Sequence, residues 1–288
     1  MFFFFAFASF TIGCYIASFL NVCIWRLPRG ESVVWPPSHC PNCNVRIRWY
    51  QNFPIVSWCV LRGKCANCGK PISARYICVE TLGGLLFLSA YLQWTASGAF
   101  LQAPSSVWTL GMASFANLWM LPVEWLVVAG LMLGAFIDLD HYYLPDRVTI
   151  GGMILGVPLS VLCPELQGET ARMAALVSSL EGLAFGFFSL WGIGWGFSKV
   201  VKRDALGFGD VKLMGAIGAF FGPASVLFTL IVSSLAGSLA GGVMMLRGRT
   251  RLGEFTAVPY GPFIAVGALM WMYWGPVLLK LYLGVLGF

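Results

Sequence analysis

The chain has 288 residues, of which 58% are hydrophobic and 10% are charged, and its formal net charge is +6. Because soluble domains carry about 25% charged residues, this composition excludes an ordinary soluble protein and predicts a polytopic membrane protein. No nucleic-acid-binding module is visible, and we interpret the excess of basic residues as a property of short loops that sets the membrane topology.

Apolar runs follow one another along the chain, and a run of about 20 residues is long enough to cross a bilayer. The first, residues 2–24, has no basic segment at its start and no small-residue cleavage site, so we expect a retained span and not a signal peptide. The other runs are 78–97, 120–138, 148–164, 174–198, 211–223, 225–246 and 258–286. The run 106–119 fits either an interfacial helix or the start of a long third span. The predicted fold is all-α and polytopic, with about eight transmembrane helices.

Lys and Arg residues are concentrated in alternate loops. Residues 25–77 carry eight of them against a single acid, Glu31, and further groups lie at 199–212 and 247–251. Because basic loops remain in the cytoplasm, we expect these loops to be cytoplasmic and both termini to lie outside. Only Arg172 and Lys280 depart from this arrangement. The expected parts are a first helix at 1–24, a cytoplasmic loop domain at 25–77 and a transmembrane core at 78–288.

The cytoplasmic loop contains two Cys-x-x-Cys pairs, formed by Cys40 with Cys43 and by Cys65 with Cys68. Their spacing is close to that of a zinc ribbon, in which four thiolates close a tetrahedral shell. A closed shell leaves no open coordination position for catalysis. A loop of about 50 residues has too small a hydrophobic core to fold without a stabilising metal ion. We therefore predict a structural zinc site in a small zinc-ribbon-like domain, with free thiols and redox pairs as the alternatives.

Two acidic clusters lie at membrane boundaries on the same, cytoplasmic side of the predicted topology. Asp138, Asp140 and Asp146 follow the third apolar run, and Asp210 opens the sixth. Charged groups at membrane depth are costly, so they usually face a wet cavity or carry a function. The topology therefore predicts that carboxylates far apart in the sequence meet at one face of the membrane.

Two facing carboxylates tend to share one proton, so that one activates a water while the other polarises a peptide carbonyl. This is the chemistry of aspartyl proteases. Gly207 and Gly209 stand just before Asp210 and lack Cβ atoms, which leaves room for another backbone to approach. The alternative is that these acids are solvated helix-end residues, or that they pair with Arg147 and Lys212.

Taken together, these motifs resemble the type IV prepilin peptidases, the bifunctional leader peptidase/N-methyltransferases that form a branch of the GxGD aspartyl proteases. The resemblance covers nearly the whole chain. It rests on Ala-Ser-Phe-Leu-Asn-Val at 17–22, Trp-Arg-Leu-Pro at 25–28, the paired cysteines, Ile-Ser-Ala-Arg-Tyr at 72–76 with Glu80, the segment 138–146, Gly-Phe-Gly-Asp-Val-Lys at 207–212 and Pro-Tyr-Gly-Pro at 259–262. In the family's first aspartate motif the catalytic residue stands eight places before the residue that follows proline, which selects Asp138 over Asp140 and Asp146.

The resemblance implies an enzyme of the bacterial inner membrane, with an active site at the cytoplasmic face formed by Asp138 and Asp210. Such an enzyme removes the basic leader of type IV prepilins and type II secretion pseudopilins after a glycine. It then methylates the new N-terminal residue with S-adenosylmethionine, and the cysteine loop is associated with that second step. The residues of the methyl-donor site stay unassigned. We expect the leader to be recognised by Asp140, Asp146 or Asp204, or by its position at the membrane, while basic loop residues contact anionic lipid.

Three other functions are compatible with the sequence. A leader peptidase without methyltransferase activity would not need the cysteine loop. A zinc-regulated transporter would account for Glu80 and Glu181, which lie inside apolar runs where a carboxyl needs a partner, although no inverted repeat is visible. A non-enzymatic assembly protein of a pilus or secretion machine would not need both aspartates.

Overall fold

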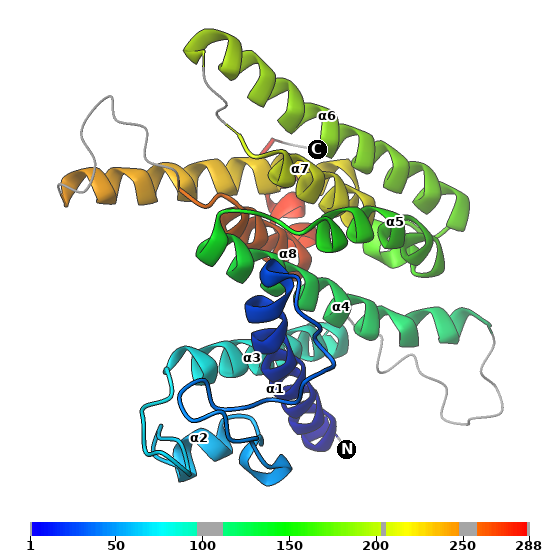
Figure 1. Ribbon diagram of the computed structural model, residues 1–288. Helices are drawn as coiled ribbons and strands as arrows, with labels where there is room; N and C mark the ends of the chain where they lie inside the picture. The colour runs from blue at the N-terminus through cyan, green and yellow to red at the C-terminus, as the bar shows by residue number, and fades with distance from the viewer. Residues whose placement is uncertain (1, 97–111, 203–205, 248–257, 287–288) are drawn as a thin grey trace. The chain divides into compact units, whose positions relative to one another are not determined.

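The computed structural model describes residues 2–96, 112–202, 206–247 and 258–286, and the regular elements among these residues are helices, with no strand. The long helices are α1 (Phe2–Arg26), α3 (Arg75–Ala96), α4 (Met112–His141), α5 (Asp146–Leu162), α6 (Arg172–Val201), α7 (Phe208–Leu246) and α8 (Gly261–Leu286), as Figure 1 shows. A short helix, α2 (Val56–Val60), lies in the loop between α1 and α3. The all-α prediction is confirmed for this part of the chain.

By length and composition, five helices in the described ranges could cross a membrane. They are Phe2–Arg29, Arg75–Ala96, Trp119–His141, Arg172–Val200 and Phe208–Leu246. A multi-pass membrane protein is therefore confirmed, while the predicted count of about eight spans exceeds these five. Of the ambiguous run 106–119, residues 106–111 lie outside the described residues. The remainder, from Met112, is helical and continues into α4.

Contacts divide the chain into two compact units, and the first combines α1, the cysteine loop, α3 and Glu124–Leu133 of α4. Helices α1 and α3 meet through small residues. A Cβ on Gly13 would lie 2.6 Å from the carbonyl oxygen of Gly83, and one on Gly83 would lie 2.5 Å from the Cβ of Ala17. Small residues at such positions let helix backbones approach closely, which is the usual source of helix association in lipid.

The buried carboxyl of Glu80 connects α3 to the cysteine loop. Its Oε2 accepts the backbone N–H of Ile55 at 2.8 Å. Ile55 has a positive φ of 62° with ψ −55°, just before α2. A carboxyl within an apolar run needs a hydrogen-bond partner. For Glu80 that partner is a backbone amide of the neighbouring loop.

The second unit combines α5, α6, α7 and α8 with residues 112–123 and 134 onward of α4. Helices α6 and α7 touch backbone to backbone, because a Cβ on Gly186 would collide with the carbonyl of Met214 and one on Gly182 with that of Gly218. These glycines therefore serve close helix packing.

Helix α7 is broken at Gly222, which has φ 76° and ψ 178°, and Pro223 follows it. The break frees carbonyl groups that water cannot reach inside a membrane. The carbonyl of Ala219 accepts from Ser179 Oγ at 2.6 Å, Ser160 Oγ at 2.9 Å and Gln167 Nε2 at 3.0 Å. The break lies close to the boundary that the sequence predicts between the runs 211–223 and 225–246.

Candidate active site and thiolate cluster

Asp138 is near the C-terminal end of α4, where the chain leaves the helix. The helix ends because Tyr142 adopts a left-handed conformation with φ 56° and Pro145 lies just beyond. The Asp138 side chain is only 6% exposed, and its Oδ2 accepts the backbone N–H of Gly261 at 2.8 Å. Gly261 is the first residue of α8, so the carboxylate lies at the positive end of that helix.

The contact with Asp138 requires glycine at position 261. A Cβ there would lie 2.9 Å from Oδ2 of Asp138 and 3.3 Å from its Cγ. The Pro-Tyr-Gly-Pro segment therefore supplies a donor and leaves the space that the carboxylate occupies. Tyr260 is held in turn by its hydroxyl, which lies 2.8 Å from Ser233 Oγ on α7.

Asp210 is in the first turn of α7 and is 8% exposed. Gly207 precedes the helix as its N-cap, and its carbonyl accepts the N–H of Asp210 at 3.1 Å. A Cβ on Gly207 would lie 3.0 Å from Asp210 Oδ2. Within the described residues, Oδ1 of Asp210 is buried without a hydrogen-bond partner. The Asp210 carboxyl group interacts electrostatically with Asp138. An unpaired buried carboxylate oxygen is costly, about 1–3 kcal/mol, so Oδ1 is suited to accept a hydrogen bond from a ligand.

Gly209 explains how the two aspartates approach one another. A Cβ at this position would lie 2.9 Å from the Cβ of Leu144, a buried residue of the segment between α4 and α5. The start of α7 therefore packs directly on the chain that leaves α4. In the structure Gly207 borders the carboxylate of Asp210, whereas Gly209 serves this packing.

The other candidate acids differ from this pair. Asp146 is exposed at the start of α5 and forms an ion pair with Lys212, whose Nζ lies 2.6 Å from Oδ1. Lys212 therefore pairs with Asp146, as one of the alternatives predicted for these acids. Asp138 and Asp210 form no ion pair within the described ranges. Asp140 is exposed at the end of α4. Asp204 lies outside the described residues.

The four paired cysteines come together in the first unit. Their sulfur atoms all lie within 4.8 Å of one another. The two knuckles share one hydrogen-bond pattern: Cys40 N–H donates to Val45 O, and Cys65 N–H donates to Lys70 O. A residue with positive φ closes each turn, Asn44 in the first knuckle and Gly69 in the second.

The chemistry of this cluster suits a bound cation. Backbone N–H groups of Cys68 and Asn67 lower the pKa of Cys65 to about 6, and the N–H of Val45 lowers that of Cys43. The N–H of Lys70 lowers the pKa of Cys68, but burial and hydrogen bonds with the other three sulfur atoms raise it to about 11. Four thiolates this close repel one another unless a positive charge lies among them. A set of four sulfur ligands is that of structural zinc sites. The donor set therefore fits the predicted zinc.

Comparison with known proteins places these features in one family. Residues 11–94 match the Bacterial Peptidase A24 N-terminal domain, and residues 125–242 match the Type IV leader peptidase family. Each aspartate of the pair and the segment joining α4 to α5 fall within the second match. The chain belongs to the type IV leader peptidase family.

Relatives cover nearly the whole chain. It is 30% identical to the prepilin leader peptidase/N-methyltransferase of Pseudomonas aeruginosa, over 99% of this chain and 95% of that protein. It is also 30% identical to the enzyme of the same name from Stutzerimonas stutzeri, over 97% and 94%. It is 34% identical to the Type 4 prepilin-like proteins leader peptide-processing enzyme of Escherichia coli, over 91% of each. No solved structure matches the chain.

Sequence reasoning missed the role of Gly261. The residue belongs to a segment named for its resemblance to the family, but nothing in the sequence connects it with Asp138, which lies 123 positions earlier. A glycine directly before a proline at the start of an apolar run is a signal for a helix N-terminus. That the terminus lies next to the aspartate is visible only in the folded structure.

Proposed function

We propose that the chain is an aspartyl endopeptidase that removes the leader of type IV prepilins after a glycine and then methylates the new N-terminal residue. The observation that carries the peptidase part is the pair of buried carboxylates, Asp138 and Asp210, at helix ends of one compact unit. The relatives named prepilin leader peptidase/N-methyltransferase support both activities.

In the proposed mechanism the two carboxylates hold one proton between them. Asp138 is suited to carry the negative charge, because the Gly261 N–H and the start of α8 stabilise an anion there. It takes a proton from the attacking water, while Asp210 donates a hydrogen bond to the scissile carbonyl. The water oxygen bonds to the carbonyl carbon, the peptide C–N bond breaks, and the leaving amine receives a proton.

Gly207 gives the substrate room beside Asp210. It is exposed and lacks a Cβ, so an extended peptide can lie against its backbone. Gly209 contributes indirectly, since its packing on Leu144 holds Asp210 near Asp138. For recognition of the basic leader, Asp140, Asp146 and Asp204 remain the candidate acids, beside its position at the membrane, and Asp146 also pairs with Lys212.

The proposed setting is the bacterial inner membrane, with the aspartates at its cytoplasmic face and about eight spans that include both segments of α7. We keep the division into a first helix at 1–24, a methyltransferase-associated loop domain at 25–77 and a peptidase core at 78–288. Zinc on Cys40, Cys43, Cys65 and Cys68 would order the loop. S-adenosylmethionine would supply the methyl group. Type II secretion pseudopilins would be further substrates. Anionic lipids would contact the basic loops.

The test is mass spectrometry of a prepilin incubated with the purified chain in lipid, with and without S-adenosylmethionine. We expect cleavage after the leader glycine in both samples and a donor-dependent gain of one methyl group on the new N-terminus. Cleavage without methylation would leave a leader peptidase alone. An intact prepilin in the presence of a folded sample would refute the proposal.

A further inference from the structure

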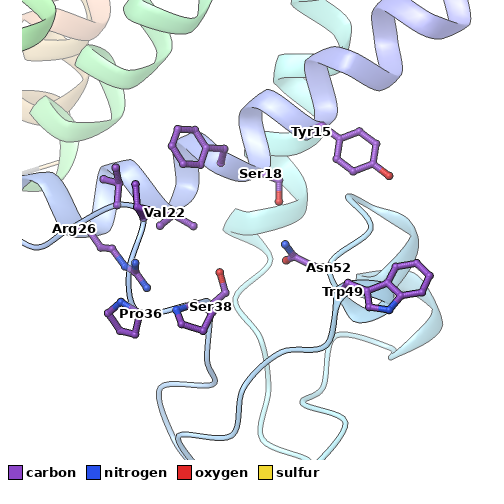
Figure 2. Close-up of a pocket in the computed structure, with 12 residues that line it drawn as sticks. Tyr15, Ser18, Val22, Arg26, Pro36, Ser38, Trp49 and Asn52 are labelled. Atoms are coloured by element: carbon purple, nitrogen blue, oxygen red, sulfur yellow. The ribbon is translucent and has the colours of Figure 1, made fainter.

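A cavity of about 330 Å³ lies in the first unit, between α1 and the loop that follows it (Figure 2). The side chains that line it come from residues 15–26 of α1, from the segment 33–38, and from Trp49 and Asn52. Small-molecule sites in proteins measure about 300–1,000 Å³, so this cavity is large enough for one compact ligand. Neither Asp138 nor Asp210 lines it, so its lining is distinct from that of the candidate peptidase site.

The only charged residue in the lining is Arg26, whose side chain is 7% exposed. Its Nη1 donates to the carbonyl of Ser32 at 2.9 Å, which fixes the guanidinium at the cavity wall. Arg26 forms no ion pair with any described residue. A buried guanidinium that lacks a counter-charge favours an anionic group, and its remaining N–H donors match a carboxylate or a phosphate.

Three polar side chains point into the same space, Ser18 from α1 and Ser38 and Asn52 from the loop (Figure 2). None of them forms a hydrogen bond with a side chain or backbone group in the ranges that the structure describes. Together they offer two hydroxyls and one amide to a ligand. A few convergent polar groups in a mostly apolar lining are characteristic of small-molecule sites.

Aromatic rings complete the lining. Trp49 is 77% exposed, and its ring is held edge-on against Tyr50 at 5.8 Å and Phe53 at 6.0 Å between centroids. Tyr15 and Phe19 add further exposed rings from α1. An aromatic face of this kind stacks on a planar heterocycle and attracts a cation.

We propose that this cavity is the binding site of the methyl donor, S-adenosylmethionine. The inference rests on the methyltransferase part of the proposed function. Arg26 takes the carboxylate of the donor, Trp49 takes its adenine ring, and the two serines and Asn52 bind its ribose and amino groups. When bound, the donor supplies a methyl group on a sulfonium: the amine nitrogen of the cleaved pilin bonds to the methyl carbon, the carbon–sulfur bond breaks to leave a neutral thioether, and the nitrogen releases a proton.

The thiolate cluster shapes this cavity. Ser38 stands two residues before Cys40, and its carbonyl accepts the N–H of Ile47 on the far side of the first knuckle at 2.9 Å. The knuckle therefore holds the Ser38 wall against α1. This gives the cysteines a positioning role in methyl transfer without any contact with the reacting atoms.

The test measures binding of S-adenosylhomocysteine, the product form of the donor, to the full chain in nanodiscs by isothermal titration calorimetry. We expect Trp49→Ala and Asn52→Ala each to weaken binding at least tenfold and to raise the KM for S-adenosylmethionine, with a smaller effect on kcat. The matched control is Trp119→Ala, which removes an exposed indole from α4 that does not line the cavity. It should bind as the wild type does. Leader cleavage in the same samples reports whether each variant is folded.

The outcomes separate this inference from the proposed function. If the wild-type chain does not methylate a cleaved pilin, the methyltransferase part of the proposed function is wrong. If it does, and both cavity variants bind S-adenosylhomocysteine as tightly as the wild type, only the cavity assignment is wrong. Nanodiscs of phosphatidylcholine with and without phosphatidylglycerol test a lipid headgroup as the occupant. Displacement of S-adenosylhomocysteine by the anionic lipid, without an effect of Trp49→Ala, would assign the cavity to lipid.

Discussion

The cysteine loop and the aspartate pair hold their functional groups in opposite ways. In the loop the only α-helix is the five-residue α2, and large apolar side chains such as Val34 and Val60 are exposed, so little apolar core supports it. The aspartates are on long helices that pack through glycine; the Asp138 carboxylate accepts the backbone N–H of Gly261, and that of Asp210 lies beside Gly207. From this comparison we predict that order in the loop depends on a cation. Order at the aspartates depends on close packing of helix ends.

The largest expected effect comes from the carboxylates themselves. Asp138→Asn and Asp210→Asn should each slow leader cleavage at least about 1,000-fold, which corresponds to about 4 kcal/mol of transition-state stabilisation. The measurement is the initial rate of cleavage by mass spectrometry. Asp146→Asn is the control, because that acid is exposed and only pairs with Lys212, and its rate should stay within a few-fold of wild type. A catalytic variant that cleaves at near-normal rate would contradict the assignment.

The next effect sharpens the contrast between the two regions. Cys65→Ser should remove the bound metal, since the site loses one of four thiolates, and it should abolish methylation while cleavage persists. Metal content by mass spectrometry and both activities are measured on one preparation. Cys59→Ser, an exposed cysteine of the same loop outside the cluster, should keep the metal. Equal metal content in the two variants would exclude the four-cysteine site.

A smaller effect is expected at the contact between Asp138 and α8. Gly261→Ala places a methyl group 2.9 Å from the Asp138 carboxylate, which must move, so we expect cleavage to slow by about 10- to 100-fold. Gly284→Ala is the matched control, because a Cβ at that position of the same helix meets no atom within 4 Å. If both variants cleave alike, the contact does not position Asp138.

The smallest effect concerns the break in α7. Gln167→Ala removes the amide that binds the Ala219 carbonyl and Ser160, and it should lower the free energy of unfolding by about 1–3 kcal/mol. Thermal unfolding followed by tryptophan fluorescence measures the loss. Glu165→Ala changes an exposed residue of the same short helix (Pro164–Gln167) and should leave the midpoint unchanged. A Gln167→Ala midpoint equal to wild type would show that other donors satisfy the break.

The sequence predicts features that depend on local pattern. Hydrophobic runs mark the helices, the Cys-x-x-Cys spacing marks the knuckles, and the charge bias puts Asp138 and Asp210 on one side of the membrane. Contacts between residues far apart in the sequence cannot be predicted from such local patterns. The Gly261 donor to Asp138 and the packing of Gly209 on Leu144 arise only when helix ends meet. The cavity beside Arg26 likewise forms where α1 and the loop face one another, and no periodicity encodes it.

The central claim is that Asp138 and Asp210 act as one catalytic unit. The most direct test compares the cleavage rate of the double variant, Asp138→Asn with Asp210→Asn, with the rates of both single variants. Residues that act as a unit are strongly non-additive, so we expect the double variant to be no more than a few-fold slower than either single one. Rates that fall as the product of the two single effects would show independent contributions and contradict the account.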